Sequence, residues 1–257
     1  MILYKYVNKY ACKRIINDST LTFTKPEYLN DIFETSAGHH QEEENTFWKG
    51  YPRENSTNSN YGVLSLTRNP LNPIMWSHYA DEHKGFVIGI DCEQAGLNNP
   101  ESYVLPAKHG SVIYTKTKPV NTYQKHDAKI IINGELDKFD TEYLEALQRI
   151  FLYKSVEWAY EEEIRVIKSN LNRHEQKNVR SEPKREIAKI PSKSIVSIHI
   201  GMRNPCKGNK KIDLFECIKK NHPDIDIFAC AMKKNSWELT ESKYGKDWGQ
   251  EINDEYM

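Results

Sequence analysis

Apolar and polar positions along the chain alternate in some segments and follow the 3.6-residue period of a helix in others. These two patterns predict short strands mixed with helices. Alternating or continuous apolar runs predict strands at residues 2–7, 20–24, 62–67, 85–91, 161–168, 186–190, 194–201 and 224–231, with shorter ones at 103–105 and 110–116. Helical spacing is clearest over residues 138–156, and further helices are predicted at 9–17, 73–82 and 209–221. The polar stretch 36–61 predicts a helix piece followed by a mobile loop.

The order of these elements predicts the fold class. Strands are interrupted by helices without a regular βαβ cadence, which favours an α+β fold over a doubly wound sheet. We therefore expect a single domain over residues 1–234, with small, mostly antiparallel sheets that can be split, and with flanking helices. Residues 235–257 are predicted to form an acidic, loosely held C-terminal tail.

Composition narrows the class of protein further. The five cysteines are odd in number and contain no CxxC pair, which argues against a disulfide framework or a zinc ribbon. The first residues lack the apolar core of a signal peptide, and no run of 18 apolar residues occurs. We therefore expect a cytoplasmic protein with no membrane association.

Charge is balanced overall but unevenly distributed. The formal net charge is zero, yet residues 168–234 carry 16 basic and 7 acidic side chains. A basic region of this kind can attract nucleic acid or an acidic protein, so a non-catalytic binding module is one hypothesis. The alternative is a solvated Lys-rich surface balanced by the acidic tail.

The strongest candidate for chemistry is the charged run that begins at Glu161. On a strand, Glu161, Glu163 and Arg165 would share one face, because side chains alternate between faces. Two carboxylates oriented by an arginine suit acid/base work or stabilisation of a sugar cation. Trp158 and Tyr160 just before them are rings of the kind that line nucleotide pockets. The alternative is an exposed strand edge with a local salt bridge.

Two further segments carry aromatic rings beside polar groups. Tyr4 and Tyr6 could stack on a base while Lys5 meets a phosphate, although a plain amphipathic strand has the same pattern. A second segment contains an imidazole among rings, which a surface loop also explains: Trp76, His78 and Tyr79.

Metal chemistry has weaker support in the sequence. His78 and His83 are five residues apart, unlike the four of an HExxH zinc site, and no metal is expected. A metal-dependent nuclease remains a third hypothesis, in which Glu161 and Glu163 act with Asp31 or Asp91. The Asp31 segment itself favours a cap or turn.

Four segments taken in order resemble a widespread bacterial and phage-associated family of unknown function. Its members carry L-Y-K-Y, N-D-P-F-E, W-x-H-Y-A with G-F and I-G-F-D, and W-x-Y-E-x-E-x-R. The matching segments here span roughly residues 3–201: Leu3–Tyr6, Leu29–Glu34, Trp76–Asp91 and Lys154–Arg165. Ile32 departs from the pattern, because it stands where the family has proline.

At a more distant level the layout resembles the ADP-ribosyltransferase superfamily. Those enzymes place a polar or basic residue on the first strand, Ser, Thr or Tyr on a middle strand, and a catalytic Glu on a late strand. Lys5, Ser65 and Glu163 stand in that order, and Glu161-x-Glu163 is similar to the ExE of one branch. Lys5 departs from the usual Arg or His.

The resemblance implies an NAD-consuming enzyme that modifies a protein or nucleic-acid acceptor, as toxins and antiphage effectors do. Cleaving the nicotinamide–ribose bond develops an oxocarbenium cation. Glu163 would stabilise that cation, Glu161 would orient or deprotonate the acceptor, and Arg165 would hold both carboxylates. The NAD contacts would come from the segments described above: Tyr4, Lys5, Tyr6, Ser65, Trp76, His78, Tyr79 and Trp158. The sequence alone fixes neither the acceptor nor the oligomeric state.

Overall fold

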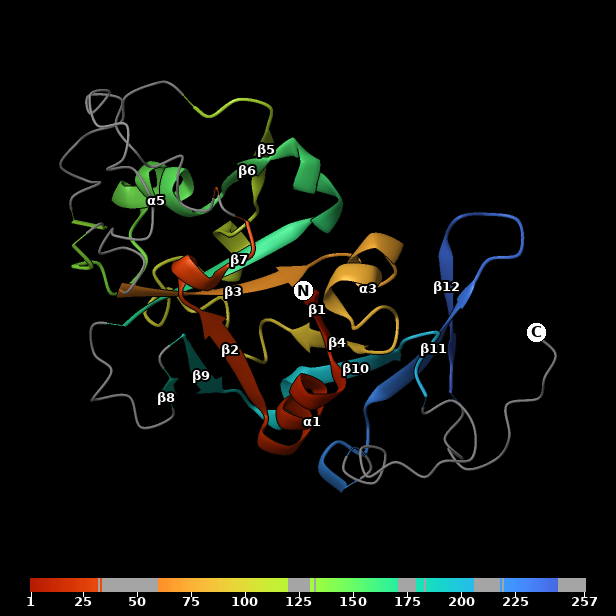
Figure 1. Ribbon diagram of the computed structural model, residues 1–257. Coiled ribbons are helices and arrows are strands. Elements are labelled where there is room, and N and C mark those ends of the chain that lie inside the picture. The colour runs from red at the N-terminus through yellow and green to blue at the C-terminus, as the bar shows by residue number, and fades with distance from the viewer. Residues whose placement is uncertain are drawn as a thin grey trace. The chain divides into compact units, whose positions relative to one another are not determined.

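The computed structural model describes residues 1–31, 33, 60–119, 130–131, 133–170, 179–182, 184–205, 218 and 220–244. The chain forms two compact units, each made of segments that are far apart in sequence (Figure 1). The first unit contains Met1–Thr20, Thr67–Ala95 and Ile190–Met257, and the second contains Leu21–Leu66 and Gly96–Lys189. Both mix helices with mostly antiparallel strands, so the predicted α+β class is confirmed.

The first unit has a sheet in the order β12-β11-β10-β4-β1. Strand β4 is buried at all but its last residue and pairs antiparallel with both β1 and β10. β10 and β11 are parallel, which requires a crossover connection between them. The strands are β1 (Ile2–Val7), β4 (Phe86–Asp91), β10 (Ile195–Ile200), β11 (Asp226–Met232) and β12 (Leu239–Lys243).

Two α-helices of this unit begin at asparagine caps. The Asn8 side chain accepts a hydrogen bond from the Ala11 amide at the start of α1 (Lys9–Asp18). Asn72 accepts from two amides at the start of α3 (Pro73–Tyr79), where Pro73 occupies the first turn. The 3-10 helix η8 (Ser192–Ser194) leads into β10.

The second unit carries the strands that surround the charged run. Their order is β3-β2-β9-β8, with β7 paired to β3, and a separate parallel pair joins β5 to β6. Their bounds are β2 (Thr20–Thr24), β3 (Tyr61–Thr67), β5 (Ile113–Thr115), β6 (Tyr153–Ser155), β7 (Glu163–Ser169), β8 (Val179–Glu182) and β9 (Arg185–Lys189).

Helix α5 (Leu144–Phe151) supplies the main helical face of the second unit's core. Its buried face includes Leu147, Ile150 and Phe151, which belong to one apolar cluster with Tyr61 of β3 and Ile167 of β7. The described residues of this unit also form four 3-10 helices: η1 (Pro26–Tyr28), η5 (Ala107–His109), η6 (Thr141–Tyr143) and η7 (Val156–Glu161).

Some elements differ from the sequence prediction. The helix predicted over 138–156 ends at Phe151, and Tyr153–Ser155 forms β6, which pairs parallel with β5. Part of the predicted loose tail is also ordered, because β12 pairs with β11 through five residues. The predicted loop at 36–61 and helix at 209–221 lie almost wholly outside the described residues.

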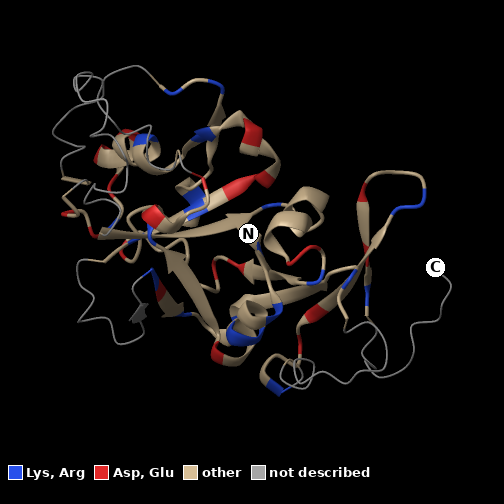
Figure 2. Cartoon of the chain, in the orientation of Figure 1, with Lys and Arg blue, Asp and Glu red and all other residues tan. Residues whose placement is uncertain are grey.

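Charged side chains are spread over many elements of both units, with acidic and basic residues interspersed (Figure 2). Parts of the basic region 168–234 fall outside the described residues, namely 171–178, 183, 206–217 and 219, and its proposed binding surface stays a prediction. In the described parts of the chain, no helix combines the length and apolar character that crossing a membrane requires.

Candidate functional site

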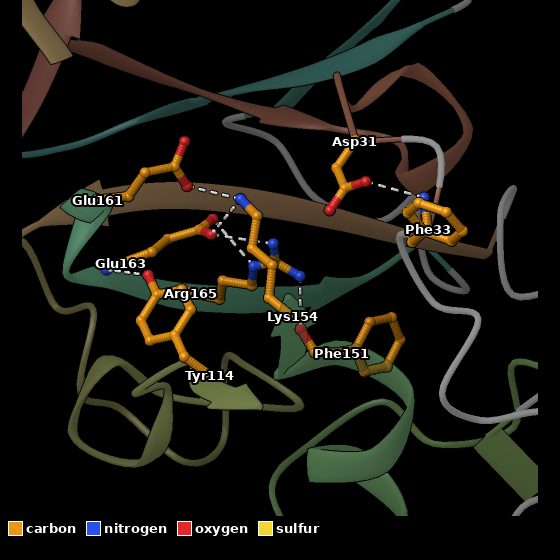
Figure 3. A network of polar contacts seen from close by, with 8 residues as sticks. All are labelled: Asp31, Phe33, Tyr114, Phe151, Lys154, Glu161, Glu163 and Arg165. Atoms are coloured by element: carbon orange, nitrogen blue, oxygen red, sulfur yellow. Dashed lines mark hydrogen bonds and ion pairs between the residues drawn. The ribbon is translucent and has the colours of Figure 1, made fainter. Parts of the chain in front are cut away.

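The second unit buries a four-residue charged network around Glu163 and Arg165. Arg165 Nε donates to Glu163 Oε1 and Arg165 Nη2 donates to Glu163 Oε2, both at 2.9 Å. The two residues are two apart on β7, so the strand holds their side chains on one face, as the sequence predicted. This is a bidentate charge-assisted pair, which fixes the carboxylate plane as well as its position (Figure 3).

Lys154 connects that pair to the second carboxylate. Its Nζ lies 2.6 Å from Glu161 Oε2 and 3.1 Å from Glu163 Oε2. The side chains of all four residues are at most 6% exposed. Among the described residues, these four side chains carry two negative and two positive charges, and such balance offsets part of the cost of burying them.

Glu161 reaches the network by a different route from the one predicted. It is the last residue of the 3-10 helix η7, and β7 begins only at Glu163. Glu162 between them has a left-handed φ of 46° and an exposed side chain, so the chain turns sharply there. The prediction that Glu161 lies on the strand is therefore wrong. The two carboxylates still meet, because the turn brings both to Lys154.

Neighbouring groups hold the network from several sides. The Tyr114 hydroxyl accepts a hydrogen bond from the Glu163 amide at 2.9 Å, and Ser65 of β3 hydrogen-bonds the Glu163 side chain. Arg165 Nη1 donates to the Phe151 carbonyl at 2.6 Å, which ties the guanidinium to the end of α5. Gly110 packs directly on β7, since a Cβ there would lie 1.8 Å from the Arg165 carbonyl oxygen.

These contacts set the ionisation of the site. Burial alone would raise the pKa of Glu163, but Arg165, Lys154 and the Ser65 hydrogen bond together hold that pKa well below its usual value. Glu163 is therefore a carboxylate at neutral pH despite its burial. Burial, together with the nearby carboxylates, raises the pKa of Tyr114 to about 12, so its hydroxyl keeps its proton.

Two aromatic residues of η7 adjoin the network. Lys154 Nζ lies 4.9 Å from the centroid of the Trp158 ring, a cation–π contact. Trp158 and Tyr160 are both half-buried, with ring centroids 6.1 Å apart. Burial and the Glu161 carboxylate raise the pKa of Tyr160. These rings are the part-exposed border of an otherwise buried cluster.

The remaining residues that were predicted to contact NAD belong to the first unit. Tyr4 and Lys5 of β1 are half-buried, and the Tyr4 ring lies edge-on to His199. Tyr6 is buried: its hydroxyl donates to the Asn69 carbonyl and accepts from the Asn72 amide. Tyr6 thus braces the turn that leads into α3.

The α3 residues divide between core and surface. Trp76 is fully buried, and its Nε1 donates to the Pro70 carbonyl at 2.8 Å. Its ring also meets Tyr6 edge-on, so Trp76 belongs to the core of the first unit. His78 is exposed and Tyr79 is half-buried, with their ring centroids 6.2 Å apart.

The acidic residues named for metal chemistry have structural roles. Asp31 is buried and its Oδ1 accepts from the Phe33 amide at 3.0 Å, which is a turn contact (Figure 3). Asp91 accepts from the amides of the two turn residues that follow it closely, Glu93 and Gln94. Among the described residues, no three His, Cys, Asp or Glu side chains are grouped closely enough to hold a metal ion.

Lys154 and Tyr114 are the members of the site that the sequence did not single out. Lys154 stood in one of the motifs, seven residues before Glu161, but it fell within a predicted helix. Tyr114 comes from a separate short strand, β5, which pairs with β6 and so lies beside Lys154 in the sheet register. The signal that the sequence offered for Lys154 was its place in the same motif as Glu161 and Glu163. Its burial could not be predicted from the sequence.

Comparison with known protein families finds a similarity over part of the chain. Residues 75–166 match the family described as "Protein of unknown function (DUF2971)". No curated protein and no solved structure matches the chain. The matched segment includes the Trp76 motif and ends one residue after Arg165. Over this segment the chain is therefore similar to an uncharacterised family, and its function must be argued from the site.

Proposed function

We propose that the network around Glu163 is the reaction centre of an ADP-ribosyltransferase-like enzyme that uses NAD to modify a protein or nucleic-acid acceptor. The observation that carries the proposal is the buried Glu161–Lys154–Glu163 arrangement, in which Arg165 fixes one carboxylate. Desolvating four charges costs several kcal/mol for each ion, and apolar residues of similar volume often stabilise a fold at least as well. Perturbed charged groups of this kind cluster at functional sites.

The arrangement suits cleavage of a ribosyl bond. Loss of nicotinamide leaves positive charge on the ribose, and an ionised carboxylate already fixed in place can stabilise that charge without reorganising. Glu163 has those properties, because its pKa is held low and its plane is fixed by Arg165. Ser65 hydrogen-bonds Glu163 from β3, as the middle-strand residue of the resemblance would.

Glu161 and Lys154 take the remaining roles in this proposal. Glu161 accepts from Lys154, a point charge on a flexible stem, whereas Glu163 is gripped in a bidentate pair by the planar guanidinium of Arg165. We assign it the orientation or deprotonation of the acceptor nucleophile. Substrate would enter past Trp158 and Tyr160, whose half-buried rings offer surfaces for stacking on nicotinamide or adenine.

The test is NAD turnover by the full chain in the presence of cell extract. Wild-type protein should release nicotinamide and transfer label from adenine-labelled NAD to a macromolecule. Glu163→Gln should reduce nicotinamide release by about 100-fold or more, since it removes a preorganised stabilising charge. Glu161→Gln should reduce transfer to the acceptor more than it reduces nicotinamide release.

Glu162→Gln is the matched control, because it makes the same change one residue away on an exposed side chain. It should leave both rates within about twofold of wild type, in the manner of an ordinary surface substitution. Equilibrium dialysis of NAD with wild-type protein adds a measurement that needs no variant. A folded wild type that neither binds NAD nor releases nicotinamide would rule out the proposal, as would a fully active Glu163→Gln protein.

A further inference from the structure

The first unit contains a serine, a histidine and a glutamate whose side chains contact one another in that sequence. Ser197 Oγ lies 3.3 Å from His199 Nε2, and Glu241 Oε2 lies 2.7 Å from His199 Nδ1. Ser197 and His199 are two apart on β10, so they share a face, and Glu241 comes from β12. A nucleophile beside a base that is itself oriented by a third group is the arrangement that activates hydroxyls for covalent catalysis.

Two aromatic rings pack against the His199 imidazole. The Phe228 ring of β11 stacks on it with centroids 4.8 Å apart, and the Tyr4 ring meets it edge-on at 5.6 Å. A carboxylate only accepts hydrogen bonds, so Glu241 favours the tautomer with the proton on Nδ1. Nε2 is then left with a lone pair toward Ser197. Burial lowers the pKa of His199 more than Glu241 raises it, so the ring is a neutral base.

The strand is irregular where the serine is placed. The pairing of β10 with β4 shifts register between Ile195 and Ser197, and such bulges re-aim side chains. Ser197 then lies opposite Gly89, where a Cβ would come within 2.1 Å of its hydroxyl oxygen. The Tyr4 ring borders the same point at 3.3 Å. Ser197 is 7% exposed, and Tyr4 and Glu241 beside it are half-buried.

We propose that Ser197, His199 and Glu241 form a second reactive site, a serine nucleophile that cleaves small carboxylic esters. Ser197 Oγ attacks the carbonyl carbon while His199 Nε2 takes the hydroxyl proton. The ester C–O bond breaks, His199 protonates the departing alkoxide, and an acyl group remains on Ser197. Water then attacks this acyl-serine, giving its proton to His199, and the carboxylic acid leaves as Ser197 regains its proton. Glu241 orients the ring throughout.

The test uses a reporter-tagged fluorophosphonate on the full chain. Its phosphorus bonds to Ser197 Oγ as fluoride leaves, and the serine proton passes to His199. We expect one adduct, which peptide mass spectrometry places on Ser197, and a burst of p-nitrophenol from p-nitrophenyl acetate. His199→Gln should slow labelling by about 100-fold or more, as loss of a general base does. Glu241→Gln should slow it by a smaller factor.

Ser194→Ala is the matched control for Ser197→Ala. Ser194 is also a buried serine, three residues earlier, but its hydroxyl donates to the Pro191 carbonyl at 2.6 Å. Its loss should leave labelling unchanged, whereas Ser197→Ala should abolish the mapped adduct. Mapping on wild-type protein needs no variant, so a folding defect cannot hide the answer. A folded wild type without an adduct on Ser197, or a His199→Gln protein labelled at the wild-type rate, overturns the proposal.

Discussion

Replacing Arg165 by methionine should destabilise the second unit more than an ordinary core substitution does. The change removes the bidentate cation of Glu163, so that among these four described side chains two carboxylates face the single charge of Lys154. Removing one partner of a buried pair costs about 3–5 kcal/mol. Arg165 also gives up three hydrogen bonds that involve a charged group, each worth about 1.5–3 kcal/mol. The two values overlap, since the ion pair with Glu163 consists of two of these hydrogen bonds, so they are not added.

The expected cost can be measured as a shift in unfolding temperature. For a chain of this size, each kcal/mol corresponds to roughly 2–4 °C, so the midpoint should fall by about 6–20 °C. Circular dichroism and urea titration should agree on the loss. Glu163→Gln alone should also destabilise, since it leaves the cluster with excess positive charge.

The double variant distinguishes a coupled pair from two independent side chains. With Arg165→Met and Glu163→Gln together, Glu161 and Lys154 remain as a neutral pair. The double variant should therefore be more stable than the sum of the single losses predicts, by about 2 kcal/mol or more. Strict additivity of the two losses would refute the argument that charge balance holds the network together.

The same reasoning predicts a pH dependence. The folded-state pKa of Glu163 is held below the unfolded value, which is about 4.3 for glutamate. Its contribution to stability is therefore complete above that value and is lost as pH falls toward the folded pKa. Wild-type protein should lose more stability between pH 5 and pH 3 than Glu163→Gln does, as urea titrations at each pH would measure. A steeper acid loss in the variant would contradict the assignment.

Three further substitutions test the supports of the fold. Tyr114→Phe removes the acceptor of the Glu163 amide and should cost about 1–3 kcal/mol in urea unfolding, whereas an unchanged midpoint would mean that this hydrogen bond contributes nothing. Gly110→Ala places a Cβ 1.8 Å from the Arg165 carbonyl oxygen and should cost at least about 1–3 kcal/mol; a neutral result would show that β7 can move aside. Asn72→Ala removes the cap of α3 and should cost about 1 kcal/mol, which thermal unfolding measures, while Asn72→Asp should retain most of the stability.

Much of the secondary structure follows from local sequence pattern. The strands β1, β2, β4 and β10 lie where apolar runs or alternation predict them, because a half-buried or buried sheet face imposes that pattern on the chain. The helix predicted over 138–156 was too long, because apolar residues continue past Phe151 while the backbone changes from helix to strand. Composition could not mark that change; the parallel pairing of β6 with β5 determines it.

The two candidate sites also combine features that follow from local sequence with features that follow from the fold. The sequence by itself determined that Glu163 and Arg165 share a face, and likewise Ser197 and His199, because side chains alternate with a period of two on any strand. Only the tertiary structure decided their partners. Lys154 reaches Glu163 through β6, and Glu241 reaches His199 from β12. Local periodicity specifies which face a side chain occupies, whereas the path of the chain through the sheet specifies what stands opposite it.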